Sequence, residues 1–290
     1  MYNIFIMNEL IFTVSEQMNN STTLDFLKNQ GVSDEIIKKV KIGGVFVNDV
    51  LLKNINTKVS TGDTVKIALP LDTPNPHITP VKGEIDVVYE DEYILAINKP
   101  KGMLTHSSKH NSTIALDQLV CGYYSPNPFI FRAINRLDKD TSGIILIAKD
   151  TFTASQLGEQ MKQGKILKTY SALVKGSPIQ NHFTIEKPIK KQSPNSIKRV
   201  CDNDGKYAKS ECVVAKRLEN GNSIIDVSLI TGRTHQIRVH LSSIGYPLYA
   251  DALYGESVPN ETYTLCSKKL QFVHPITKKE TTIELKQEKF

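Results

Sequence analysis

The sequence contains no tryptophan and only four cysteines among its 290 residues. The cysteines, at positions 121, 201, 212 and 266, form no C-x-x-C pair and have no regular spacing with histidine, so we expect no metal site. We expect four reduced thiols that are mostly packed in the interior. Without tryptophan, any stacking on a flat ring must use tyrosine, phenylalanine, histidine or arginine.

The sequence also lacks a long hydrophobic run. No apolar stretch approaches the roughly 20 residues that a membrane-spanning helix needs. The first residues, MYNIFIMNELIF, have neither the basic segment nor the small-residue cleavage site of a secretory signal. Hydrophobic residues make up 40% and charged residues 23%, which is ordinary for a folded chain in water. We therefore expect a cytoplasmic protein with no membrane partner.

Positive charge is distributed unevenly along the chain. The net charge is +6, from 36 Lys+Arg and 30 Asp+Glu. Residues 1–70 contain no arginine, and their seven lysines balance seven acids, so the whole excess lies downstream. This excess permits a polyanionic partner without requiring one.

A proline-rich stretch, ALPLDTPNPHITPVKG, divides the chain. Proline fixes φ and cannot donate a ladder hydrogen bond, so this stretch predicts an extended linker over residues 71–80. It separates a small unit at 15–70 from a large one at 81–290.

The small unit predicts two short helices followed by strands. A threonine at 22 or 23 can cap the first helix, and the second runs from Ser33 with Ile36, Ile37 and Val40 on its apolar face. The segments GGVFVN and GDTVKI each predict a turn and a strand. Over residues 21–69 this order resembles the small α/β RNA-binding domain first seen in ribosomal protein S four, and the resemblance implies RNA binding.

The large unit predicts many short strands and few helices. Strands are expected in IDVVYEDEYILAINKP, GIILIAK, KTYSALVKG and NSIIDVSLITG, and helices over residues 152–163 and 234–244. The strands do not alternate regularly with helices. The pattern therefore predicts an α+β domain with a mixed, largely antiparallel sheet and flanking helices.

Two segments place polar groups next to predicted strands. In NRLDKDTSG, Asp138 lies in a polar turn before a buried strand, two residues after Arg136. A surface ion pair explains this turn equally well from the pattern alone. In KTYSALVKG, alternation puts Tyr170 on one face with Ala172 and Val174, and a core aromatic is the simpler interpretation.

A third segment, ITGRTHQIRVHL, predicts a strand end and a helix. Thr234 can cap this helix, whose start then favours a nearby anion. His235 and Arg238 are three residues apart and share a face, while Ile237 and Leu241 point elsewhere. Arg238 is thus free to reach a carboxylate or phosphate, although a solvated charged face is the common alternative.

Together, NRLDKDTSG, KTYSALVKG and TGRTHQIRVHL resemble, in order, the three motifs of the pseudouridine synthases of the large ribosomal-uridine type. The segments EDEYILAINKPKGMLTH, DGKYAKSE, LYADALYG and FVHP support the resemblance, which covers about residues 81–285. One position departs from the pattern, because Asn135 stands where the family usually has histidine. Asparagine keeps hydrogen-bonding capacity but cannot titrate.

The resemblance implies an RNA uridine isomerase that uses neither cofactor nor metal. It implies that Asp138 is the essential carboxylate, that Tyr170 packs on the target base, and that Arg238 pairs with the aspartate. The residues that it implies for substrate binding are Arg136, which fills the gap left by the flipped nucleotide, Arg233 at a phosphate, Leu229 or Ile230 at the uracil, and His235.

Several alternatives remain at this point. The carboxylate can attack the anomeric carbon or act as a base at the neighbouring ribose carbon. Large-subunit ribosomal RNA is the favoured substrate because the amino-terminal domain often accompanies it, and transfer RNA is the alternative. A non-catalytic RNA-binding or ribosome-assembly factor would keep the same fold. A glycoside-type hydrolase would need a second acid, for which Asp140 is the local candidate. We expect a monomer.

Overall fold

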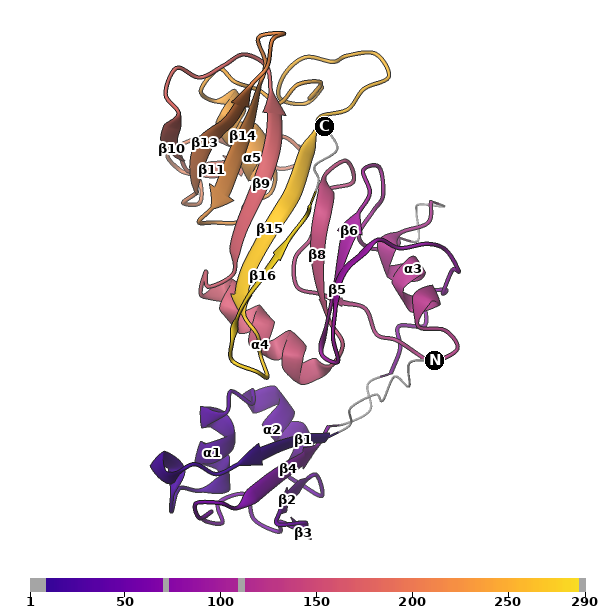
Figure 1. Cartoon of the computed structure of the whole chain (residues 1–290), viewed down its shortest axis with the longest axis vertical. Helices are drawn as coiled ribbons and strands as arrows, with labels where there is room; N and C mark the ends of the chain where they lie inside the picture. Colours follow the sequence, from indigo (N-terminus) through magenta and orange to yellow (C-terminus); the bar gives the residue numbers. More distant parts are fainter. Residues whose placement is uncertain (1–8, 70–72, 109–112, 287–290) are drawn as a thin grey trace.

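Two separate sheets organise the computed structural model, which describes residues 9–69, 73–108 and 113–286 (Figure 1). The first sheet has four strands in the order β1-β4-β2-β3 and belongs to the amino-terminal unit. The second has ten strands and forms most of the remaining chain. No helix in the described ranges is long and apolar enough to cross a membrane.

The amino-terminal unit packs two short helices on its sheet. Of the two predicted candidates, Thr22 caps the first helix with its side chain at the amide of Asp25. Ser33, at which the second helix was expected to begin, caps that helix at the amide of Ile36. The first strand lies before residue 15, at which the sequence prediction began this unit. The elements are β1 (Glu9–Thr13), a short 3-10 helix (Glu16–Met18), α1 (Thr23–Asn29), α2 (Asp34–Val40), β2 (Val45–Val47), β3 (Val50–Leu51) and β4 (Thr64–Ala68).

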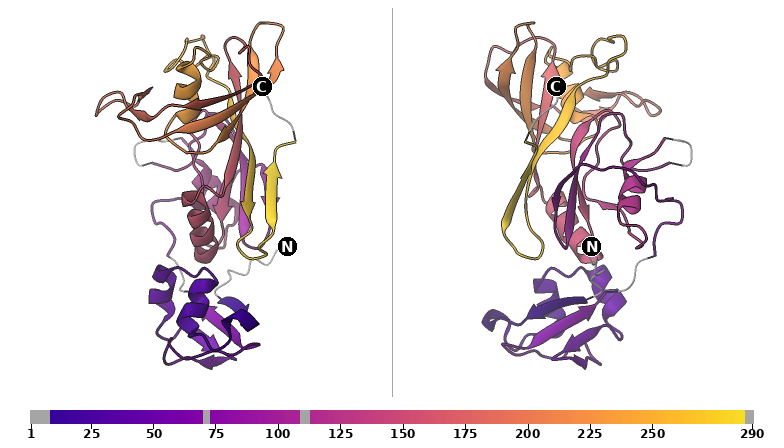
Figure 2. Two further views of the ribbon diagram at one scale, coloured as in Figure 1. Left: turned by 90° about the vertical axis from the view of Figure 1, so that its left-hand side faces the viewer. Right: turned by 45° about the vertical axis from the view of Figure 1, so that its right-hand side comes forward.

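The amino-terminal unit rests on helix α4 (Thr151–Lys162) of the large unit (Figures 1 and 2). Phe152 is fully buried in the apolar cluster of the small unit, with its ring 6.0 Å from that of Phe12. The Gln156 side chain donates a hydrogen bond to the carbonyl of Gly31. These contacts fix the orientation of the small unit. Of the linker predicted over 71–80, residues 71 and 72 lie outside the described residues, and residues 73–80 form no helix or strand.

The large sheet follows the order β10-β13-β14-β9-β15-β8-β6-β5, with β16 paired to β15 and β7 to β8. Every described pairing is antiparallel except that of β15 with β8, which confirms the predicted α+β class with a mixed, largely antiparallel sheet. The strands are β5 (Val87–Glu90), β6 (Ile94–Lys99), β7 (Arg132–Ala133), β8 (Ser142–Ala148), β9 (Leu167–Val174), β10 (His182–Glu186), β13 (Lys209–Arg217), β14 (Ser223–Leu229), β15 (Leu265–Val273) and β16 (Glu280–Glu284). A separate hairpin joins β11 (Ile189–Lys191) to β12 (Arg199–Cys201).

Helices cover both faces of the large sheet. Residues of α3 (Leu116–Tyr123) and α5 (Gln236–Ser242) share one apolar cluster with Ile145 and Ile147 of β8. Ile144 and Leu146 point to the opposite face and share a second cluster with α4. Strand β8 is therefore buried on both faces, as its continuous apolar run predicted.

The two halves of the large sheet meet at a short parallel contact. Strands β8 and β15 pair only through Ser142 with Cys266 and Gly143 with Ser267. Gly143 has φ +107°, and a Cβ there would lie 2.4 Å from the Ser267 carbonyl oxygen. Ser267 also pairs with Tyr170 on β9. The register therefore brings the turn before β8 and the middle of β9 to one place in the sheet.

This close approach gives a stability prediction. We expect Gly143→Ala to lower the free energy of unfolding by at least about 2 kcal/mol, because alanine adds both a strained φ and a clash with backbone. The matched control is Gly158→Ala in α4, where a Cβ meets nothing within 4 Å and helix propensity improves. Urea unfolding of both variants measures the difference. Equal stability of the two variants would contradict the assigned register.

Candidate active site

All three polar segments singled out in the sequence meet in one cleft of about 440 Å³. The cleft lies where the turn before β8 faces the beginning of α5. Residues from the turn, from β9, from the end of β14 and from α5 form its walls. The residues implied in binding or chemistry that line it are Arg136, Asp138, Tyr170, Leu229, Arg233, His235 and Arg238.

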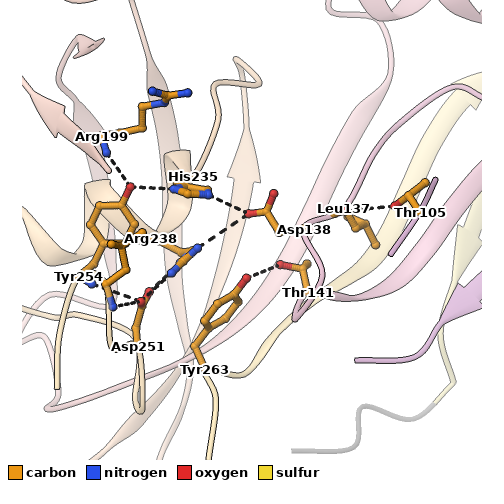
Figure 3. A network of polar contacts seen from close by, with 11 residues as sticks. Thr105, Leu137, Asp138, Thr141, Arg199, His235, Arg238, Asp251, Tyr254 and Tyr263 are labelled. Atoms are coloured by element: carbon orange, nitrogen blue, oxygen red, sulfur yellow. Dashed lines mark hydrogen bonds and ion pairs between the residues drawn. The ribbon is translucent and has the colours of Figure 1, made fainter. Parts of the chain in front are cut away.

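Hydrogen bonds to two backbone carbonyls fix the turn that carries Asp138. The Leu137 carbonyl accepts a hydrogen bond from the Thr105 hydroxyl at 3.1 Å (Figure 3). The Asp138 carbonyl accepts one from the amide of Thr141. The Asp138 side chain itself is 41% exposed and faces the cleft. A fixed backbone with an open carboxylate is the arrangement that a reacting group needs.

A buried lysine fastens this turn to the end of β6. Lys99 Nζ donates to the carbonyls of Pro100, Met103 and Lys139 at 2.8–3.1 Å. Burial lowers the pKa of Lys99 to about 8, and the charges of Asp140 and Asp138 oppose this shift. These three hydrogen bonds satisfy the three donors of an ammonium group. Through the bond to the Lys139 carbonyl, Lys99 fixes the backbone next to Asp138.

Arg238 connects two carboxylates. Its Nε and Nη2 atoms donate to the two oxygens of Asp251, each at 2.7 Å, and Nη1 lies 4.0 Å from Asp138 Oδ2 (Figure 3). The guanidinium carbon is 4.2 Å from the centre of the Tyr263 ring and 4.9 Å from that of Tyr254. Burial acts to lower the pKa of Arg238, but the bonds to Asp251 raise it overall. Arg238 is therefore a fixed cation beside Asp138.

Asp251 is a functional candidate that sequence reasoning missed. Its side chain is fully buried, and its Oδ1 also accepts from the amides of Leu253 and Tyr254. The segment LYADALYG supported the family resemblance, but no role was assigned to its aspartate. The signal in the sequence was only the acidic residue in that supporting segment, and nothing there linked it to Arg238.

His235 lies on the other side of Asp138. Its Nε2 is 3.7 Å from Asp138 Oδ2, and its Nδ1 is 2.8 Å from the Tyr254 hydroxyl. The prediction that Thr234 caps the helix was wrong, because His235 occupies the cap position in a left-handed conformation with φ 58°. The Gln236 side-chain oxygen accepts a hydrogen bond from the backbone amide of Arg233. This backbone geometry is what turns the imidazole toward Asp138.

The apolar wall of the cleft contains Tyr170 and Leu229. Tyr170 is only 7% exposed and belongs to the core cluster, so it is both a core aromatic and a cleft residue. Burial raises the pKa of Tyr170 to about 12, and its phenol is therefore neutral. The sequence prediction named Ile230 together with Leu229, but Ile230 lies outside the cleft. Its side chain is 48% exposed, because successive side chains of a strand point to opposite faces.

The Asn135 side chain joins the turn to β8 by hydrogen bonds. Its amide nitrogen donates to the carbonyl of Ile144 at 3.0 Å, and its oxygen accepts from the amide of Leu146 at 2.8 Å. The side chain is buried and both of its polar atoms are bonded. The neutral Asn135 side chain thus links the turn to β8 with one donor and one acceptor. This role does not need a group that titrates.

Three cations face the cleft without a carboxylate partner in the described ranges. They are Arg136 and Arg233, which are exposed, and Lys168 on β9, whose Nζ is 3.6 Å from the sulfur of Met161. Arg233 Nε donates to the carbonyl of Tyr207. Burial lowers the pKa of Lys168. Lys168 was not predicted, although it precedes Tyr170 by two residues. Unpaired cations around an opening suit a polyanionic ligand.

Comparison with known proteins places the chain in a class of RNA-modifying isomerases. The sequence model of the RNA pseudouridylate synthase family matches residues 93–243, which include the turn, β9 and α5. The chain belongs to the RNA pseudouridine synthase family, whose members isomerise uridine in RNA.

Individual relatives extend this result. The chain is 36% identical over 226 residues to the Bacillus subtilis protein named Uncharacterized RNA pseudouridine synthase YhcT, covering 77% of this chain and 74% of that protein. It is 32% identical to Ribosomal large subunit pseudouridine synthase D of Zymomonas mobilis, covering 87% and 85%. The solved structure of Human RNA Pseudouridylate Synthase Domain Containing 1 superposes with a TM-score of 0.60 at 23% identity over 70% of this chain and 84% of that one, which supports the fold.

Proposed function

We propose that this chain converts uridine to pseudouridine in large-subunit ribosomal RNA and that Asp138 carries out the chemistry. The observation that carries the proposal is the position of the Asp138 carboxylate, which is open to the cleft and flanked by Arg238 and His235. The reaction breaks the N-glycosidic bond, turns the uracil and joins its carbon five to the ribose, with no net gain or loss of atoms.

The proposal assigns a role to the residues that line each side of the cleft. Asp138 either attacks the anomeric carbon or removes a proton from the neighbouring ribose carbon, and both routes begin from the carboxylate. Tyr170 and Leu229 give the detached uracil an apolar surface. Arg136 fills the space left in the RNA stack, which offsets part of the few kcal/mol that flipping a nucleotide costs. Arg233 and Lys168 meet the phosphates.

Ribosomal RNA is the substrate that two findings favour. The relative in Zymomonas mobilis carries a ribosomal large-subunit name, and it aligns over 87% of this chain. The second finding is the small unit, whose order of helices and strands resembles the S-four-type RNA-binding domain. A hydrolase with paired acids finds no support, because Asp140 does not line the cleft.

Release of tritium from RNA containing uridine labelled at carbon five tests the proposal. Transcripts of large-subunit ribosomal RNA should release tritium, while transfer RNA transcripts should release at least tenfold less per minute. Release from transfer RNA alone would assign the other substrate. Tight binding of RNA without any release would show a non-catalytic factor.

Removal of the small unit should affect RNA binding more than the chemical step. We expect a chain of residues 73–290 to keep kcat within about threefold of the full chain and to show a KM for ribosomal RNA raised at least about tenfold. The truncated chain should carry Phe152→Gln, because the deletion uncovers this buried ring. Full-length Phe152→Gln serves as the control. Loss of turnover at saturating RNA would contradict this division of labour.

A further inference from the structure

A chain of hydrogen bonds behind Asp138 ends at His235. The backbone amide of Arg199 on β12 donates to the Tyr254 hydroxyl oxygen at 2.8 Å, since an amide can only donate. The same hydroxyl lies 2.8 Å from His235 Nδ1 (Figure 3). Within the described parts of the chain, Arg199 and His235 are the two hydrogen-bond partners of this hydroxyl.

The Arg199 amide uses one lone pair of the Tyr254 oxygen and leaves the hydroxyl proton free to donate. His235 Nδ1 is its acceptor in the described parts of the chain, and we therefore assign a lone pair to Nδ1. A neutral imidazole with a lone pair on Nδ1 carries its proton on Nε2. Nε2 is the atom that faces Asp138 Oδ2, at 3.7 Å. This distance is longer than a hydrogen bond, and catalytic hydrogen bonds commonly shorten when the substrate is bound.

We propose that His235 is a positioning residue, held by Tyr254 in the Nε2–H form so that it donates a hydrogen bond to Asp138. With Arg238 on one side and His235 on the other, the carboxylate has two donors aimed at Oδ2. The donors set the direction in which the free oxygen points toward the ribose. The inference rests on the proposed role of Asp138 and changes the role predicted for His235 from substrate contact to orientation of the carboxylate.

The charges around His235 favour the neutral form that this role uses. Burial lowers the pKa of His235 most, Asp138 opposes that shift, and the cations Arg238 and Arg199 lower the pKa further. Asp251 also opposes it, from the far side of Arg238. The Tyr254 ring lies 5.6 Å from the His235 ring between centroids, and Lys198 Nζ lies 5.7 Å from the centre of the Tyr254 ring.

A matched pair of substitutions isolates the donor. His235→Gln and His235→Met are both unbranched and meet the same left-handed backbone, but only glutamine offers an N–H near the position of Nε2. We expect His235→Met to lower single-turnover rates on ribosomal RNA about 10- to 100-fold, as for loss of a bond to a charged group, and His235→Gln to stay within about fivefold of wild type. RNA affinity should change less than twofold in both. Equal loss in the two variants, or a large loss of affinity, would overturn the proposal.

Tyr254→Phe adds a test by pH. Without the hydroxyl, neutral His235 can place its proton on either nitrogen and turns a lone pair toward Asp138 part of the time. At low pH the imidazolium carries a proton on Nε2 regardless. Because the pKa of His235 lies below its ordinary value, the deficit of Tyr254→Phe relative to wild type should grow about twofold as pH rises from 4.5 to 7.5. A deficit that does not change with pH would mean that Tyr254 only supports the fold.

NMR of protein labelled with nitrogen-15 histidine provides a readout that does not need activity. We expect His235 of the wild type to show a protonated Nε2 and an unprotonated Nδ1 at pH 7.5, and Tyr254→Phe to show a mixture. A protonated Nδ1 in the wild type would overturn the proposal even if the enzyme is active. Conversely, a wild type that modifies no RNA would refute the proposed function while the NMR result still decides the form of His235.

Discussion

Asp138→Asn should abolish pseudouridine formation while leaving the protein folded. We expect turnover on ribosomal RNA to fall at least about 10⁴-fold, because the amide can neither attack the ribose nor accept its proton. The Asp138 side chain is 41% exposed and lies in a turn held through backbone carbonyls, so the fold does not depend on its charge. Release of tritium from uridine labelled at carbon five measures turnover, and thermal unfolding measures the fold.

The natural control lies two residues away in the same turn. Asp140→Asn removes an equal charge but does not touch the cleft, and we expect its turnover to stay within about threefold of wild type. The pair also separates an isomerase from a hydrolase, because paired acids would make both residues necessary. Comparable losses in the two variants would mean that the turn as a whole, rather than one carboxylate, is required.

Asp251→Asn should give the second large effect, on activity and stability together. The change leaves the buried charge of Arg238 without its two-bond partner, and breaking such a pair costs about 3–5 kcal/mol of stability. Arg238 is then free to turn fully toward Asp138, which moves the Asp138 carboxylate away from its reactive orientation. We expect kcat to fall about 100-fold. Urea unfolding measures the loss of stability.

Glu256→Gln is the matched control for this prediction. Glu256 lies on the same loop and pairs with Lys175, but its side chain is 71% exposed. Exposed pairs contribute little, so we expect less than about 0.5 kcal/mol and no loss of turnover. If Asp251→Asn were as stable and active as Glu256→Gln, the two-carboxylate arrangement around Arg238 would have no functional meaning.

Elements with strong local signals could be predicted from the sequence. Thr22 and Ser33 have the chemistry of helix caps, and the continuous apolar run of β8 indicated burial on both faces. The ordered motifs indicated the family, which the matching family model confirms. The roles of Asp138, Tyr170 and Arg238 stay predictions, although the structure places all three in one cleft.

Features that depend on distant contacts could not be predicted. The helix was expected to be capped by Thr234, but His235 holds the cap position in a left-handed conformation that no local sequence rule indicates. The pairing of Arg238 with Asp251 joins residues from a helix and a loop, and no spacing rule links them. Strand β1 was missed because its partner β4 lies about 50 residues downstream.

The position of the target nucleotide relative to Asp138 is the most direct test of the account. A crystal structure of the Asp138→Asn variant with a bound ribosomal RNA fragment would show it. We predict an extruded uridine whose ribose lies about 3–3.5 Å from the residue 138 side chain, with its base on Tyr170. RNA bound elsewhere on the protein, with the cleft empty and the target uridine still stacked, would contradict the account.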